Sequence, residues 1–190
     1  MQVAYIVPSS KVLVKRVARK MDFSKPRFIV EYGPGEGCHT REIVKRMHPD
    51  SKMLLFELDP ELAAFLKHQF RHEPRVSVLQ QDALDLPSEL AKRGIPYCDY
   101  IVSGLPFSII NIHTKRILLQ KTFDSLAPTP ESAFIIYQMT KELQKHAKRF
   151  PRLECEFCLQ NIPPMFVMKL YKQPLHGHAN GHKINGGNRH

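Results

Sequence analysis

A glycine-rich stretch directly after an apolar run is the segment of this sequence best suited to binding a ligand. Residues 31–37 lie between a predicted strand over 27–32 and a predicted helix over 40–47. Glycine allows the backbone to turn tightly and to approach a ligand closely. In open α/β sheets, ligands bind at the carboxyl ends of the strands. We therefore predict a ligand-binding turn made of Glu31, Tyr32, Gly33, Pro34, Gly35 and Gly37.

Two further carboxylates follow the next two predicted strands. Glu57 ends a strand over 52–58, twenty residues beyond Gly37, and Leu58 comes next. Asp82, followed by Ala83, lies just past a strand over 75–79. A carboxylate can accept hydrogen bonds from both hydroxyls of a ribose. The pattern predicts that a ribose-bearing ligand lies across the ends of these successive strands.

Strand and helix signals alternate along the rest of the chain. Further strands are predicted over 99–103, 132–139, 153–160 and 166–172, and further helices over 60–70, 113–126 and 141–148. Alternating strands and helices predict a mostly parallel sheet with helices on both faces. The last two strands predict an antiparallel hairpin that closes one edge. The fold class is therefore α/β, with a Rossmann-like sheet of seven strands in a single domain over residues 1–172.

The composition indicates which partners and which cellular compartment to expect. The 190 residues carry 28 Lys and Arg against 18 Asp and Glu, a net charge of +10, which favours an anionic partner, either nucleic acid or membrane. No signal peptide or run of about 20 apolar residues is found, so we expect a cytoplasmic protein. The four cysteines lack the spacing of a metal site, and we expect reduced thiols and no metal. Residues 173–190, rich in His, Gly and Asn, are expected to form a disordered tail.

A basic amphipathic helix is predicted over about residues 10–21, with Ser9 or Ser10 as its cap. One face carries cations and no acid, and the opposite face is apolar. Such a helix is typical of attachment to an anionic membrane. Packing of Val14 and Val17 against the sheet is an equally good interpretation. The cations are Lys11, Lys15, Arg16, Arg19 and Lys20.

The glycine turn resembles motif I of the class I methyltransferases, which use S-adenosylmethionine. A dinucleotide-binding fingerprint would need glycine at position 38, where Cys38 stands. The resemblance implies that the loop wraps the methionine part of the cofactor, with Glu31 near its amino group. It also implies that Glu57 binds the ribose and that Asp82 and Ala83 bind the adenine. The product would be S-adenosylhomocysteine.

The segment 103–107, Ser-Gly-Leu-Pro-Phe, bears on the methyl acceptor. Adenine-N6 methyltransferases, including the ribosomal RNA dimethyltransferases, carry Asn or Asp at this motif, followed by x-Pro-Tyr/Phe. Their polar side chain holds the adenine amine and their aromatic ring stacks on the base. This sequence keeps Leu105, Pro106 and Phe107 but has Gly104 in place of the polar residue.

The combined segments 7–10, 31–37, 103–107 and 161–164 resemble the bacterial phospholipid N-methyltransferases. This resemblance implies methyl transfer to the amine of phosphatidylethanolamine and its mono- and dimethyl forms, giving phosphatidylcholine. We expect a cytoplasmic protein associated peripherally with the inner face of the cell membrane, and a monomer. The alternative is a ribosomal RNA adenine-N6 methyltransferase, which the positive charge and the Leu-Pro-Phe stretch also fit. Against this alternative, residues 1–190 are not expected to form the extra helical domain that those RNA enzymes carry after the sheet.

The acceptor amine must lose a proton before it attacks, since primary ammonium groups have a pKa of about 10. Candidates for the proton acceptor are Tyr5, His113 and Tyr137. We expect the backbone of Ser103 and Gly104 to orient the amine, and Ser103 to lie against the cofactor as well. The expected walls of the acceptor site are Leu105, Pro106 and Phe107, with Ser9 and Ser10 contributing from the N-terminal segment.

Overall fold

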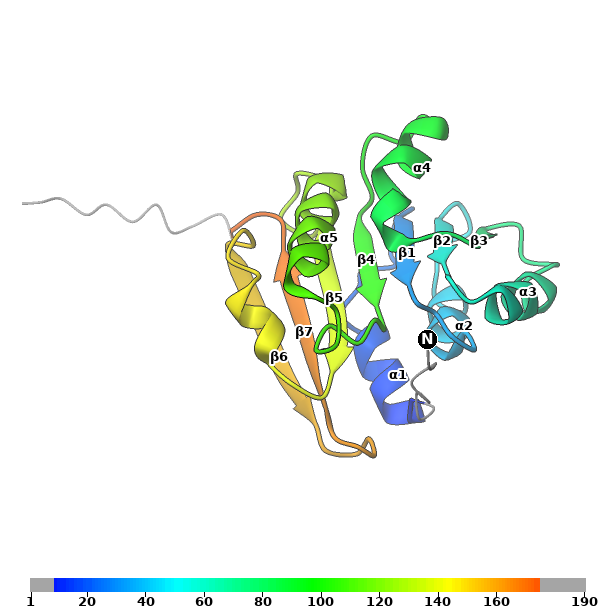
Figure 1. Ribbon diagram of the computed structural model, residues 1–190. Helices are drawn as coiled ribbons and strands as arrows, with labels where there is room; N and C mark the ends of the chain where they lie inside the picture. The colour runs from blue at the N-terminus through cyan, green and yellow to red at the C-terminus, as the bar shows by residue number, and fades with distance from the viewer. Residues whose placement is uncertain (1–8, 175–190) are drawn as a thin grey trace, which may run out of the picture.

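The computed structural model describes residues 9–174 and contains one mixed sheet with the strand order β3-β2-β1-β4-β5-β7-β6 (Figure 1). Strands β1 to β5 are parallel, and β7 runs antiparallel between β5 and the edge strand β6. The predicted sheet and its C-terminal hairpin are confirmed. The strands are β1 (Phe28–Tyr32), β2 (Lys52–Phe56), β3 (Val76–Leu79), β4 (Tyr100–Ser103), β5 (Ala133–Gln138), β6 (Arg152–Cys158) and β7 (Met165–Tyr171).

Helices cover both faces of the sheet, as predicted. Helices α1 (Lys11–Ala18), α2 (Cys38–Val44) and α3 (Pro60–Gln69) bury Leu13, Ile43 and Leu66 against one face. Helices α4 (Leu86–Lys92) and α5 (Ile112–Ser125) bury Leu86 and Leu118 against the other. Within residues 9–174, no helix combines the length and the apolar character needed to cross a membrane.

The strand order reverses its direction between β1 and β4. From β1 the chain proceeds outward to β2 and β3, whereas from β4 it proceeds in the opposite direction to β5. In open α/β sheets, such a reversal marks the ligand site at the carboxyl ends of the strands. Tyr32 and Ser103 are paired in register there. The glycine turn and the segment 103–107 therefore meet at one edge of the sheet.

Several element boundaries differ from the sequence prediction. Helix α4 and the short 3-10 helix η1 (Ala83–Asp85) were not predicted, and α1 ends at Ala18. The helix predicted over 141–148 is reduced to the 3-10 turn η2 (Glu142–Lys145). Within η2 Leu143 alone is buried. A segment so short and polar gains too little from packing to offset the cost of helix nucleation.

The N-terminus of α1 is fastened to the turn between β6 and β7. The Ser10 side chain caps α1 by accepting a hydrogen bond from the Leu13 amide at 3.2 Å. The Ser10 amide donates to Oδ1 of Asn161 at 2.8 Å, and Nδ2 of Asn161 donates to the Pro163 carbonyl at 2.8 Å. Asn161 is 2% exposed. Two segments about 150 residues apart in the sequence are thereby joined at the site edge of the sheet.

The prediction that α1 presents five cations to solvent is wrong for two of them. Lys20 forms an ion pair with Glu156, and Arg16 donates to the Phe157 carbonyl at 3.0 Å. The edge strand β6 supplies these partners, which no periodicity within α1 could indicate. The other three cations, Lys11, Lys15 and Arg19, are exposed.

The four cysteines are unpaired, as expected. Cys155 and Cys158 stand three residues apart on β6 and therefore point to opposite faces of the sheet. Cys155 packs beside the cluster beneath α4 and α5, and Cys158 lies in the cluster beneath α1 and α2. The C-x-x-C match therefore does not bring two thiols together.

Removing the Asn161 side chain should loosen α1. Asn161→Ala leaves the Ser10 amide and the Pro163 carbonyl without their partners, at a cost of about 1–3 kcal/mol in unfolding free energy. Urea unfolding measures the loss, and amide hydrogen exchange across residues 11–18 should become faster. The control is Gln80→Ala at an exposed position far from α1 in the sequence. Equal stability and exchange in Asn161→Ala and the wild type would refute the fastening role.

Candidate active site

The three glycines of the turn after β1 adopt positive φ angles of 60°, 56° and 73° at Gly33, Gly35 and Gly37. A Cβ atom at Gly33 would lie 2.8 Å from Cδ2 of Leu105, and one at Gly37 would lie 2.9 Å from Cδ2 of Leu66. At Gly35 nothing lies within 4 Å. The outer glycines are therefore required by packing as well as by backbone conformation, whereas Gly35 borders open space where a ligand can approach the backbone.

Glu31 is a fully buried carboxylate with one unused oxygen. Oε2 accepts a hydrogen bond from Oγ1 of Thr40 at 2.6 Å, and Oε1 has no partner within the described residues. Burial raises the pKa of Glu31 to about 7. A buried oxygen without a partner is costly, so it marks a place where a ligand donor fits. This chemistry suits the ammonium group of the cofactor that the sequence predicts.

Glu57 ties the loops after β1 and β2 together. Its Oε2 accepts from the Gly35 amide and its Oε1 from the Asp59 amide, both at 3.1 Å. Each carboxylate oxygen retains a further acceptor position for a ribose hydroxyl. Leu58, the next residue, is 58% exposed.

The loop after β3 completes a row of three carboxylates at one edge of the sheet. Asp82 is half-buried and caps η1 by accepting from the Leu84 amide at 2.8 Å, and Ala83 is buried beside it. The row runs from Glu31, near the end of β1, through Glu57 after β2 to Asp82. Its members lie at the ends of neighbouring strands, as predicted.

Tyr32 contributes its backbone, not its side chain, to this edge. Side chains alternate across a strand, so Tyr32 points to the face opposite Glu31. Its ring is fully buried, and its hydroxyl lies 3.3 Å from Oγ1 of Thr122. The Tyr32 carbonyl accepts a hydrogen bond from the Gly104 amide at 3.0 Å. A contact of Tyr32 with the cofactor, which the sequence predicts, would therefore be made by its backbone.

The segment after β4 is shaped by internal contacts. Ser103 is buried, and its Oγ accepts from the Leu105 amide at 3.2 Å. Pro106 is half-buried. Phe107 is 1% exposed and packs edge-on against Phe134, with the ring centroids 6.1 Å apart. The prediction that Phe107 walls the acceptor site is therefore wrong: burial of the ring in the core leaves no face on which a base could stack.

Gly104 sits where no side chain fits. An ideal Cβ at this position would lie 3.0 Å from the Gly33 carbonyl oxygen and closer still to the hydroxyl of Tyr137. The Tyr137 ring stacks on the His39 ring, with centroids 4.1 Å apart. The hydroxyl of a β5 residue thus occupies the space that the first side-chain atom of an Asn or Asp at position 104 would need.

His39 is a site residue that the sequence reasoning missed. It is 3% exposed, its Nε2 lies 3.1 Å from Oγ of Ser9, and its Nδ1 has no partner within the described residues. Burial lowers its pKa to about 3, so the imidazole is neutral at physiological pH. Its position two residues beyond Gly37, in the first turn of α2, was the available signal. Of the two serines predicted at the substrate, Ser9 meets His39, while Ser10 serves as the α1 cap.

The three candidate proton acceptors differ in location and burial. Tyr5 lies outside the described residues. His113 is exposed in the first turn of α5. Tyr137 lies in the site, where burial and the nearby Glu31 carboxylate raise its pKa well above the usual value. Tyr137 therefore keeps its proton at neutral pH and acts as a neutral hydroxyl.

The fit at Gly104 can be tested by a double-mutant cycle. Gly104→Ala should lower the unfolding free energy by about 1–3 kcal/mol, because the new methyl group meets Tyr137 and the Gly33 carbonyl. Adding Tyr137→Phe removes the nearest atom and should restore part of the loss. Urea unfolding of the two single variants and the double variant gives the coupling energy. Additive effects would contradict the proximity argument.

Glu31 should make stability depend on pH. Its folded pKa of about 7 exceeds its ordinary value of 4.5, so the folded protein retains the proton to higher pH than the unfolded chain. This contribution is complete below pH 4.5 and is lost as the pH rises to 7. Glutamine does not titrate, so the Glu31→Gln variant does not lose stability in this way. The free energy of unfolding of the variant, relative to that of the wild type, should therefore rise by roughly 2–3 kcal/mol between pH 5 and pH 8. Urea unfolding across that range, with exposed Glu61→Gln as the control, checks this; parallel wild-type and Glu31→Gln profiles would refute it.

Comparison with known proteins is consistent with this arrangement. The family model described as ribosomal RNA adenine dimethylase matches residues 7–150. An ornithine lipid N-methyltransferase from Singulisphaera acidiphila is 32% identical over 163 residues, which cover 85% of this chain and 84% of that protein. A ribosomal RNA small subunit methyltransferase A from Mycoplasma capricolum is 32% identical over 101 residues, which cover 51% of this chain but 35% of that protein.

The fold is shared with solved methyltransferases. An O-methyltransferase from Bacillus cereus in complex with SAH superposes with a TM-score of 0.68 at 14% identity, over 89% of this chain and 84% of that one. The predicted Rossmann-like fold and the predicted cofactor are confirmed. The chain belongs to the ribosomal RNA adenine dimethylase family and is an S-adenosylmethionine-dependent methyltransferase.

Proposed function

We propose that this enzyme methylates the amine of a membrane lipid headgroup. The observation that carries the proposal is the packing at Gly104. Adenine-N6 methyltransferases hold their acceptor amine with a polar side chain at this position, and here Tyr137 and the Gly33 carbonyl fill that space. The buried Phe107 ring also offers no stacking surface for a base. A flexible alkylamine needs neither feature.

The pattern of relatives supports a lipid acceptor. The match to the ornithine lipid N-methyltransferase extends over most of both proteins. The match to the ribosomal RNA methyltransferase covers about a third of that protein's length. We propose an acceptor with a primary amine on a membrane lipid, either phosphatidylethanolamine or an ornithine lipid.

We propose that the cofactor lies across the row of carboxylates. Glu31 would pair with its amino group, Glu57 would accept from the ribose hydroxyls, and Asp82 and Ala83 would bind the adenine. The glycine turn would follow the methionine part with its backbone. Bound S-adenosylmethionine supplies a methyl group on a sulfonium, a good leaving group for in-line displacement. The protein then has mainly to position and desolvate the acceptor.

Uncharged protein side chains around the site suit a substrate amine that must be unprotonated to attack. His39 and Tyr137 are both buried and uncharged at neutral pH, so they offer hydrogen bonds without stabilising an ammonium ion. Burial beside the positive sulfonium lowers the pKa of an acceptor ammonium. The backbone carbonyls of Ser103 and Gly104 would orient the amine, with Leu105 and Pro106 as walls.

Access to a lipid requires contact with the membrane surface. The three exposed cations of α1 and the net charge of +10 favour an anionic membrane. We therefore propose a peripheral position on the inner face of the cell membrane. Three near-surface cations contribute at most about 3 kcal/mol of attraction.

The second candidate, methylation of an adenine in ribosomal RNA, rests on the family model over residues 7–150. It makes a different prediction about the acceptor. Its adenine amine would have to be held without a side chain at Gly104 and without the ring of Phe107.

The proposal is tested with methyl-labelled S-adenosylmethionine in parallel reactions. The acceptors are anionic vesicles containing phosphatidylethanolamine, the same vesicles containing ornithine lipid, and ribosomal RNA. We expect label in a lipid extract and, for Glu57→Ala, loss of at least tenfold in kcat/KM through weaker cofactor binding. The exposed Glu61→Ala is the matched control. Label in RNA alone would overturn the lipid assignment.

A further inference from the structure

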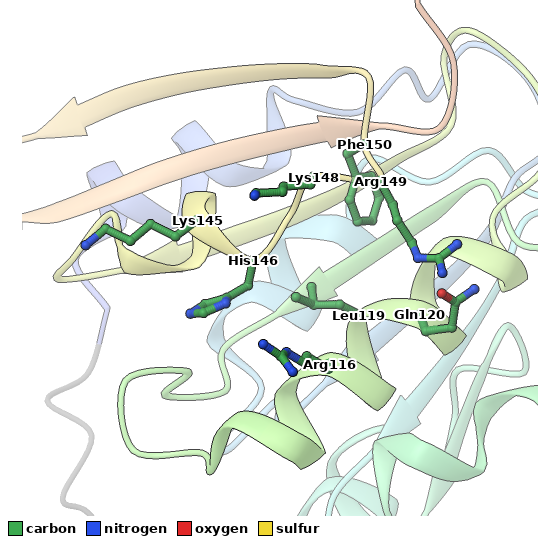
Figure 2. A pocket seen from close by; sticks show the side chains of 8 residues that line it. All are labelled: Arg116, Leu119, Gln120, Lys145, His146, Lys148, Arg149 and Phe150. Atoms are coloured by element: carbon green, nitrogen blue, oxygen red, sulfur yellow. The ribbon is translucent and has the colours of Figure 1, made fainter.

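A cavity of about 390 Å³ lies between α5 and the segment formed by the end of η2 and the residues that follow it (Figure 2). It is separate from the carboxylate row and the glycine turn. Arg116, Leu119 and Gln120 line it from α5, and the opposite wall comes from residues 145–150. Figure 2 shows cationic side chains on both walls. The lining residues of the second wall are Lys145, His146, Lys148, Arg149 and Phe150.

The positive charge of this cavity is not neutralised by the surrounding protein. Arg116, Lys145, Lys148 and Arg149 form no ion pair within residues 9–174. The neighbouring carboxylate of Glu142 is engaged by the buried Lys115 at 3.2 Å and lies 4.0 Å from His146. Four unpaired cations around a concave surface favour an anion, and guanidinium groups match phosphate geometry.

Exposed aliphatic side chains flank the elements that carry the cavity. Ile109 and Ile112, just before and in the first turn of α5, are 72% and 46% exposed. Met139, between β5 and η2, is 58% exposed. Cations beside exposed aliphatic groups are typical of proteins that lie at a lipid interface. RNA recognition commonly adds stacking of bases on accessible aromatic rings. Here the Phe150 ring is 7% exposed, which leaves the partly exposed His146 as the one accessible ring that lines the cavity.

We propose that this cavity binds the phosphate of an anionic membrane phospholipid that is not the methyl acceptor. The proposal rests on the membrane setting of the proposed function but concerns a separate site. Helix α5 is capped by Asn111, four residues beyond Phe107. A phosphate held by Arg116 and Arg149 therefore fixes the loop after β4 against the bilayer, with Ile109 and Ile112 toward the acyl region. The bound lipid orients the active site toward its substrate.

The test is binding of the full chain to vesicles of phosphatidylcholine alone or mixed with phosphatidylglycerol. Arg116→Gln/Arg149→Gln should weaken binding to the mixed vesicles by roughly 20- to 30-fold. Lys25→Gln/Lys67→Gln removes the same charge from exposed positions elsewhere and should weaken it less than threefold. Because phosphatidylglycerol has no amine, the result is independent of whether lipids are methylated. Unchanged thermal stability of both double variants confirms that they fold.

Two further arms separate the sources of phosphate. Inorganic phosphate and ribosomal RNA are titrated against the wild type and the Arg116→Gln/Arg149→Gln variant. Equal loss of vesicle binding in the two double variants would overturn the proposal, since only total charge would matter. Loss confined to RNA or to inorganic phosphate, with vesicle binding intact, would also overturn it. A selective loss on phosphatidylglycerol vesicles supports it.

Discussion

The close approach of the Gly104 backbone to the Tyr137 hydroxyl and the Gly33 carbonyl is the constraint on which the rest of the site depends. It holds the loop after β4 against the loop after β1, where the Gly104 amide donates to the Tyr32 carbonyl. It also removes the position from which related enzymes present a polar side chain to adenine. The same contact therefore joins the two halves of the sheet and limits the kind of acceptor that the site can hold.

Burial of polar groups follows from this packing. Tyr137 stacks on His39 and lies near Glu31, and all three titratable side chains are buried. Desolvation keeps the imidazole neutral and raises the pKa of the carboxyl group to about 7. Burying these polar groups costs folding free energy when no ligand is bound. Binding of a cation at the free carboxylate oxygen offsets part of that cost. Stability without ligand is thus lowered at the place where the cofactor is proposed to bind.

The sequence was sufficient to predict the sheet and the glycine turn because both depend on local patterns. Alternating strand and helix signals define the parallel sheet, and a carboxylate stands at or just beyond the end of each of the first three strands. What could not be predicted depends on contacts between distant segments. No local pattern reveals that Phe107 enters the core, that β6 supplies partners for Arg16 and Lys20, or that Tyr137 fills the space at Gly104. His39 was missed because its position after the glycine turn, the one available signal, does not indicate that it stacks on Tyr137.

The most direct measurement is a competition in one reaction. Enzyme loaded with methyl-labelled S-adenosylmethionine is given dissolved short-chain phosphatidylethanolamine, short-chain ornithine lipid and single-stranded RNA containing unmethylated adenines, all at equal concentration. We expect the label to appear in the lipid extract, and we expect the rate to be unchanged when the RNA is omitted. Label on adenine in the presence of both lipids would contradict it, because an adenine amine would then be held at Gly104 without any side chain to bind it.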